Sequence, residues 1–129
     1  MANQFVVQLK NEPGAMATLA EALAARGVDL RAIGGGGIGD SGHVIMTTAD
    51  DPTTKQVLDD GGYTYIEGES ILAEVDDKPG GMARLSRELA DAGVNIYGHL
   101  FLGRWGDRAM FAFVVDDPDR ARPILERKS

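Results

Sequence analysis

The sequence has 129 residues, 43% of them hydrophobic, which suits one globular domain of ordinary size or two very small ones. Its net charge of -7 argues against binding to nucleic acid, and its lack of cysteine excludes disulfides, thiolate zinc sites and cysteine nucleophiles. Because no basic leader opens the chain and no apolar run approaches the roughly 18 residues of a membrane span, we expect a cytoplasmic protein.

The first half of the chain predicts strands that alternate with helices. Residues Ala15 to Arg26 form an amphipathic helix in this prediction, which Gly27 ends. Its apolar face carries Met16, Leu19 and Leu23 at the i, i+3, i+7 spacing. Four strands are expected: Phe5 to Leu9, one that begins at about Leu30, His43 to Thr48, and Tyr63 to Glu67. A turn is expected at Asp40 to Gly42. A second helix should run from Pro52 to about Asp60, with Asp51 as its N-cap.

The run GGGGIGDSG, from Gly34 to Gly42, has the G-x-G-x-x-G spacing of a dinucleotide-binding loop. Such a loop must follow a strand and open a helix, whose N-terminal amides then bind the phosphate. This run instead follows a predicted helix and precedes a predicted strand, so we do not expect it to bind phosphate. Two interpretations remain open: the glycines make room for a hollow at an interface, or they give a loose, twisted sheet edge that discourages aggregation.

An internal repeat organises the whole chain. The segment Asn11 to Leu30 returns as Asp77 to Ile96, an offset of 66 residues (77 minus 11), and the triplet Asp-Asp-Pro at residues 50 to 52 returns at the same offset. The second copy therefore predicts a strand at Ile71 to Val75, a helix ended by Gly93, a strand from about Ile96, a turn at Trp105 to Asp107, a strand at Ala109 to Val115, and a helix capped by Asp117 with Pro118 in its first position.

Each copy thus predicts the order β-α-β-β-α-β, an α+β, ferredoxin-like unit with two helices on one face of an antiparallel sheet. The motifs N-E-P-G-A-M with A-A-R-G-V-D-L, and D-K-P-G-G-M with D-A-G-V-N-I, make the chain similar to the ACT domain, the small ligand-sensing module of amino-acid metabolism. The resemblance implies a stand-alone tandem ACT protein, with residues 1–69 as the first domain and 70–129 as the second. It also implies the strand order 4-1-3-2, with the second strand at an edge that ACT units use to join into wider sheets.

The second copy ends at Ser129 directly after its second helix, so we expect its sheet to lack a fourth strand of its own. A tight hairpin at Gly68 to Ser70 would let Tyr63 to Glu67 complete the second sheet instead of the first. The alternative is one long strand that crosses from one unit to the other. We prefer the hairpin.

The turn before each first helix is the expected ligand site. Unpaired amides at a helix N-terminus attract a carboxylate, and acceptors nearby would bind an ammonium group. By resemblance, ACT modules hold their effectors at these positions. The candidate donors are the amides of Gly14, Ala15 and Met16 in the first copy and of Gly80, Gly81 and Met82 in the second. The candidate acceptors are Asn11, Asp77, Asp29 and Asn95, of which Asn95 is preferred. The two turns also contain Glu12, Pro13, Lys78 and Pro79.

Each of these residues also has a purely structural interpretation. The two P-G pairs are common turn residues, and Asp29 and Asn95 can bind local backbone groups. His43 and His99 do not align under the repeat and have no partners at metal-ligand spacing, and Ser41 lacks the G-x-S-x-G context of a nucleophile.

Three functions therefore remain open: a stand-alone sensor of an amino acid or similar small carboxylate, a pure oligomerisation or interaction module, and, least supported, an enzyme. We expect no catalytic residues, metal or cofactor, no nucleic-acid or membrane partner, and a homodimer or larger homo-oligomer because an edge strand is left unpaired.

Overall fold

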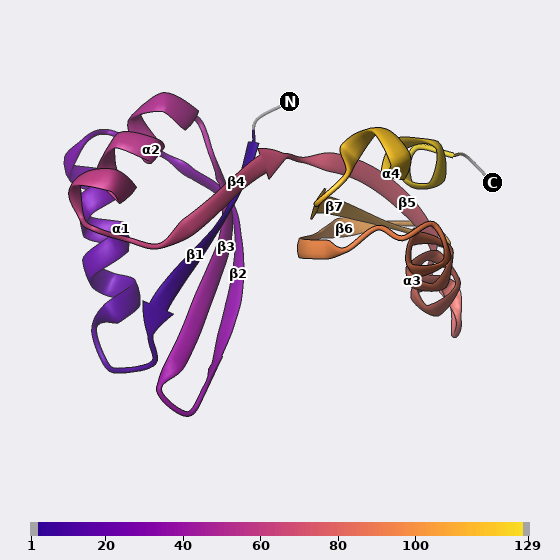
Figure 1. Ribbon diagram of the computed structural model, residues 1–129, viewed down its shortest axis with the longest axis horizontal. Helices are drawn as coiled ribbons and strands as arrows, with labels where there is room; N and C mark the ends of the chain where they lie inside the picture. The colour runs from indigo at the N-terminus through magenta and orange to yellow at the C-terminus, as the bar shows by residue number, and fades with distance from the viewer. Residues whose placement is uncertain (1–2, 128–129) are drawn as a thin grey trace. The chain divides into compact units, whose positions relative to one another are not determined.

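The computed structural model describes residues 3–127, and it divides into two compact units between Gly68 and Glu69 (Figure 1). Each unit has its own sheet, its own pair of helices and its own hydrophobic core. The fold class is confirmed, because the two sheets are antiparallel and carry four helices in a βαββαβ-like order. The exact domain bounds 1–69 and 70–129 stay a prediction.

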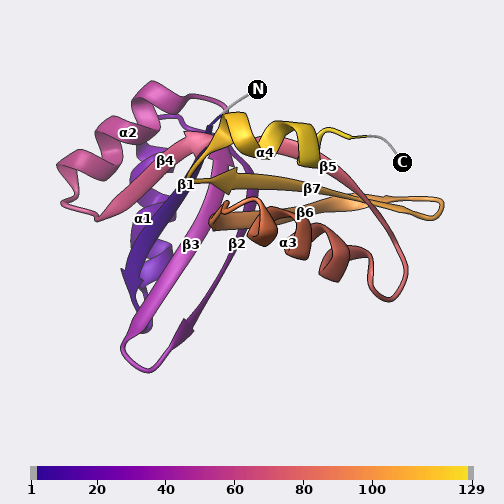
Figure 2. The same ribbon diagram turned by 45° about the vertical axis from the view of Figure 1, so that its right-hand side comes forward.

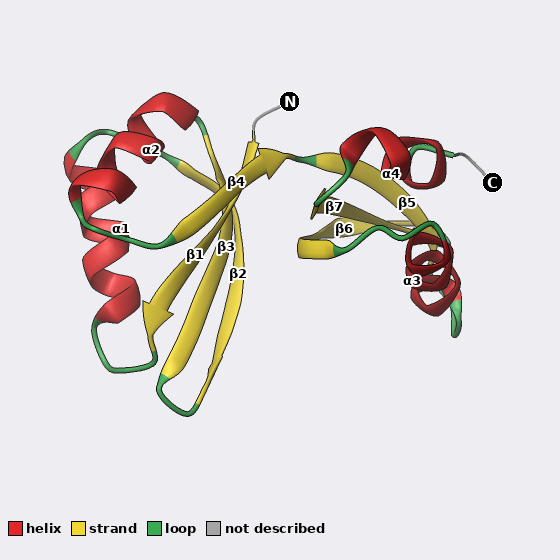
Figure 3. Ribbon diagram, in the orientation of Figure 1, coloured by secondary structure: helices red, strands yellow, loops and turns green. Residues whose placement is uncertain are grey.

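Unit 1 contains all six predicted elements (Figure 3). Its sheet has the order β2-β3-β1-β4, which is the expected 4-1-3-2 arrangement, and its two helices lie on one face of the sheet. The elements are β1 (Asn3–Lys10), α1 (Ala15–Ala25), β2 (Leu30–Ile38), β3 (Ser41–Thr48), α2 (Asp51–Asp60) and β4 (Tyr65–Glu69).

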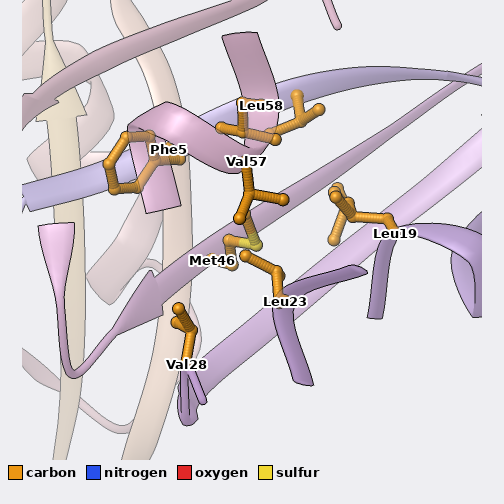
Figure 4. Packing of buried hydrophobic residues seen from close by; sticks show 9 residues of the cluster. Phe5, Leu19, Leu23, Val28, Met46, Val57 and Leu58 are labelled. Atoms are coloured by element: carbon orange, nitrogen blue, oxygen red, sulfur yellow. The ribbon is translucent and has the colours of Figure 1, made fainter. Parts of the chain in front are cut away.

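The core of unit 1 lies between the sheet and these helices (Figure 4). Alternate residues of β1 and β3, such as Phe5 and Met46, point to this face because side chains alternate along a strand. Leu19 and Leu23 of α1 pack against them and are fully buried, as their helical spacing predicts. Met16, on the same predicted stripe, is instead 36% exposed, because it lies in the first turn of the helix beyond the core.

Unit 2 repeats this arrangement with one strand fewer among the residues described (Figure 2). Its sheet has the order β5-β7-β6, and Leu89 of its first helix fills the place that Leu23 has in unit 1. The elements are β5 (Ile71–Asp76), α3 (Gly81–Asp91), β6 (Ile96–Trp105), β7 (Arg108–Val115) and α4 (Pro118–Leu125).

The predicted hairpin that would transfer the fourth strand to unit 2 is wrong, because β4 lies beside β1 in the sheet of unit 1. The Gln8 amide donates to the Thr64 carbonyl at 2.9 Å, and the Tyr65 ring packs on Phe5 with 6.1 Å between ring centres. Only Ser70 separates β4 from β5, which is too short for a hairpin loop of two or more residues. The chain therefore continues from one strand almost directly into the next, closer to the long-strand alternative.

The prediction that one offset of 66 residues relates the two copies throughout is also wrong. It fails beyond the second strand of the repeat. Strand β6 has one residue more than β2, and its register with β7 shifts between Phe101 and Gly103, so Leu102 is an inserted bulge residue. The N-cap of α2 is Asp50, not the predicted Asp51, and because of the inserted residue it is Asp50 that matches the N-cap Asp117 of α4. Both carboxylates accept a bond from a backbone amide at the start of their helix.

The contact between Tyr65 and Asp59 gives a prediction for alkaline pH. The Tyr65 hydroxyl donates to an Asp59 carboxylate oxygen at 2.6 Å, and this bond, with burial and the negative charge, raises the pKa of Tyr65 to about 12. Since an unfolded tyrosine has a pKa near 10, the stabilising effect is complete below about pH 10 and disappears as the pH rises through about 12. Spectroscopic titration of the three tyrosines should show one late-ionising group, which Asp59→Ala returns to the ordinary range and Tyr65→Phe removes.

Candidate functional site

In each unit, the connection from the first strand to the first helix is a four-residue turn that glycine makes possible. Gly14 and Gly80 have φ of 89° and 91°, the left-handed region that other residues rarely adopt. The turn closes with bonds from the Ala15 amide to the Glu12 carbonyl at 3.3 Å and from the Gly81 amide to the Lys78 carbonyl at 3.1 Å. Proline before a left-handed glycine is the pattern of a type II turn, so the P-G pairs are structural as well as candidate binding residues.

Two of the three predicted donors in each turn have no backbone acceptor. Within residues 3–127, the amides of Gly14 and Met16 in unit 1 and of Gly80 and Met82 in unit 2 donate to no backbone carbonyl. The Ala15 and Gly81 amides are already used by the turns. The open amides lie at the positive ends of α1 and α3, where a carboxylate would be stabilised.

A hollow of about 370 Å³ separates the turn of unit 1 from the glycine strand β2. The predicted residues Asn11, Glu12, Ala15 and Met16 line one side of it. Its other wall is made by residues that were not assigned to a ligand site from the sequence: Ile33, Gly34, Gly35, Gly36 and His43. The glycines of β2 therefore lie in a strand beside a hollow, and no phosphate-binding loop is formed.

Glycine is required at Gly35 of this wall, and at Gly37, further along β2, it leaves room for a side chain from the turn. A Cβ on Gly35 would overlap the backbone carbonyl of His43, because β2 and β3 approach closely there. A Cβ on Gly37 would be 2.6 Å from the Asn11 carboxamide, whose Nδ2 donates to the Gly39 carbonyl at 2.9 Å. Asn11 thus ties the P-G turn to the β2–β3 hairpin, and only its Oδ1 is left to accept a bond from a ligand.

The matching hollow of unit 2, about 350 Å³, has a different wall. Because of the bulge at Leu102, the strand register places Phe101 and Arg104 where unit 1 has Gly35 and Gly37. The Arg104 guanidinium lies 4.7 Å from the centre of the Phe101 ring, and its Nε donates to Asp77 at 2.7 Å. Asp77, Lys78, Pro79 and Met82 of the predicted set line this hollow, but the Asp77 carboxylate is already engaged.

Asp29 and Asn95 are not brought together with the turns. Each follows the C-terminal end of its helix, and the 11 residues of α1 or α3 separate it from the turn by about 16 Å at 1.5 Å per residue. Asp29 faces Arg31 at 3.5 Å, and the backbone N–H of Asn95 donates to the Asp116 carboxylate at 2.8 Å. Within one unit, neither residue shares a ligand with the free amides.

The largest hollow of unit 1, about 550 Å³, lies on the other side of the same turn, against Gly61 to Thr64. It does not reach the glycine strand, and Lys10, Glu12, Asp40 and Tyr63 give it a mixed, open lining. Among the described residues, no cluster of three or more His, Asp or Glu side chains is suited to a metal ion. No helix in this part of the chain is both long and apolar enough to cross a membrane.

The fold has clear counterparts among solved structures. A protein of Bacteroides thetaiotaomicron superposes with a TM-score of 0.71 at 20% identity, covering 97% of this chain and 86% of its own. The regulatory subunit of aspartate kinase from Thermus thermophilus gives 0.62 at 19% identity, covering 97% and 87%, and that from Thermus flavus 0.64 at 16%, covering 98% and 92%. The chain has the tandem ACT fold.

The resemblance carried by the two P-G repeats is thus confirmed at the level of the fold. No protein-family profile and no curated protein matches the sequence. The two Thermus proteins with this fold are regulatory subunits of aspartate kinase.

The turn of unit 2 gives a stability prediction. A Cβ on Gly81 would overlap the Asp76 carbonyl oxygen and lie 3.1 Å from Val75, so Gly81→Ala should destabilise the protein by about 1 to 3 kcal/mol. Gly36→Ala is the matched control, since its Cβ meets nothing within 4 Å, and it should change stability by less than about 0.5 kcal/mol. Urea unfolding measures both, and equal stability of the two variants would show that the close approach at Gly81 is unimportant.

Proposed function

We propose that this protein is a regulatory sensor that binds a small carboxylate, foremost an amino acid, in the hollow of unit 1. Binding shifts a conformational or assembly equilibrium, and the protein has no catalytic activity of its own. The observation that carries the proposal is the open space between the first turn of α1, where the Met16 amide has no backbone acceptor, and the glycine wall of β2. The proposal includes a cytoplasmic homodimer or larger homo-oligomer.

In this proposal, the Met16 amide, which lines the hollow, binds the carboxylate at the positive end of α1, and the Gly14 amide lies just outside the lining. Asn11 and Glu12 line the same hollow, and in this proposal the Asn11 Oδ1 and the Glu12 carboxylate accept from the ammonium group. Asp29 takes part only if it belongs to a second copy, because its own turn lies at the far end of the helix. The regulatory subunits with the same fold support a sensing role.

The two units are not equal in this proposal. Glycines leave the wall of the first hollow open, whereas the Arg104 side chain, packed on the Phe101 ring, lines the wall of the second. The ion pair with Arg104 also takes up the Asp77 carboxylate. We therefore assign the working site to unit 1 and a reduced or absent affinity to unit 2, whose residues Lys78, Gly80, Gly81, Met82 and Asn95 remain secondary candidates.

A second candidate function is an interaction module without a ligand. It is favoured by large apolar side chains exposed on β6, of which Trp105 is 64% exposed. Tyr97, Phe101 and Leu102 lie on the same strand and are also exposed. A group of exposed apolar side chains of this kind is typical of a surface that binds another protein.

A thermal-shift screen of amino acids and small carboxylates separates the two functions. A ligand at 100 times its dissociation constant adds about 2.7 kcal/mol to stability, which raises the melting temperature by roughly 5 to 10 degrees. Met16→Glu should abolish this shift, because it places a carboxylate in the hollow where the ligand carboxylate binds. An acidic residue in the first helical turn is itself favourable, so the variant should fold.

Two variants serve as controls for this experiment. Met16→Gln has nearly the same size without the charge and should keep most of the shift, and Met82→Glu makes the same change in unit 2 and should leave the shift unchanged. A shift that survives Met16→Glu, or is lost only in Met82→Glu, contradicts the assignment to unit 1. No shift with any compound leaves the interaction module as the function.

A further inference from the structure

Within residues 3–127, β5 of unit 2 has a strand on one side only, whereas its counterpart in unit 1 has a strand on both sides. In unit 1, β1 lies between β3 and β4. Its counterpart β5 pairs with β7 on one side, and none of the residues described forms a strand on the other. The backbone groups along that side of β5 are therefore available to another strand.

This edge is also the most regular one in the molecule. The edge strands β2 and β6 both carry register shifts, and β4 contains Gly68. Strand β5, with the sequence ILAEVD, keeps an unbroken register with β7 from Ile71 to Asp76 and contains neither glycine nor proline. Bulges, glycine and proline are three of the devices that protect sheet edges, and β5 has none of these three, although it carries the charged residues Glu74 and Asp76.

The amides that face this edge follow from the repeat. The Gln8 amide of β1 points to the β4 side, where it donates to Thr64. Because β1 and β5 have the same register with their inner neighbours, the matching amide is that of Glu74 (8 plus 66). Alternation along the strand adds the Leu72 amide, so both residues present hydrogen-bonding groups to the free edge.

A hollow of about 330 Å³ lies beside β5, lined by Leu72, Glu74, Met110 and the end of α4 from Leu125. In unit 1, Tyr63 and Tyr65, just before and at the start of β4, pack against the core. Unit 2 therefore has space as well as backbone groups for an added strand.

We propose that β5 pairs antiparallel with β5 of a second copy of this chain. The strand is self-complementary about Ala73: Ile71 lies opposite Val75, Leu72 opposite Glu74, and Ala73 opposite Ala73 of the second copy. This register uses the outward amides of Leu72 and Glu74 in both copies and avoids placing two Glu74 carboxylates opposite each other. A two-fold axis at Ala73 closes the pairing, so that no free β5 edge remains.

Cysteine cross-linking tests both the partner and the register, because the natural chain has no cysteine. Directly opposite Cα atoms in this ladder are about 5.5 Å apart, within disulfide range, whereas residues offset diagonally are roughly 7 to 8 Å apart. Mild oxidation of a mixture of Leu72→Cys and Glu74→Cys, distinguished by mass tags, should give mainly the mixed dimer. Each variant alone should give several times less, and Lys55→Cys mixed with Leu72→Cys should give only the background.

A second variant tests the backbone pairing. Glu74→Pro removes an amide directed at the free edge and leaves the bonds to β7 intact, so the fold should survive by circular dichroism while the assembly mass in sedimentation is halved. Equal cross-linking in all mixtures, or a Glu74→Pro variant of unchanged mass, would overturn the proposal. These measurements need no ligand, so they test the pairing of β5 alone. If Glu74→Pro loses the assembly but keeps the thermal shift with a ligand, ligand sensing does not depend on this pairing.

Discussion

The left-handed glycine between the first strand and the first helix of each unit is the constraint on which the rest of the arrangement depends. With φ near 90°, Gly14 and Gly80 let the chain reverse from strand to helix within four residues. This reversal places the positive end of each helix beside the end of β1 or β5 and leaves amides without backbone acceptors. The hollows, the side-chain ties to the hairpins and the proposed carboxylate site all follow from that placement.

The neighbouring strand then decides what each turn can do. Beside the turn of unit 1, glycines on β2 leave an open wall, and Asn11 uses the space over Gly37 to reach the hairpin. Beside the turn of unit 2, Arg104 reaches back to the residue that corresponds to Asn11 and stacks on Phe101. Two copies of one turn therefore support different chemistry, which is why the proposed binding function is assigned to only one of them.

The same duplication leaves an imbalance in the sheets. One fourth strand, β4, lies between the two units in sequence, and its tyrosines match the core of unit 1. Along the outer edge of β5, regularly spaced backbone groups point outward. The proposed pairing of two copies gives these groups hydrogen-bond partners from the second β5 strand. Sensing at the first turn and assembly at β5 would then involve different units of the same chain.

The sequence by itself determined the repeat, the order of the elements, the core positions such as Leu19, Leu23 and Leu89, and the rejection of a phosphate loop, because these depend on local periodicity and on turn residues. It also located the P-G turns, since only glycine adopts their conformation readily. Only the tertiary structure decided which sheet β4 joins, that Leu102 is a bulge, that Met16 lines a hollow, and that Asp29 lies a helix length away from the turn. Strand partners, bulges and pocket walls depend on contacts between residues distant in the chain, and a local pattern carries no information about those contacts.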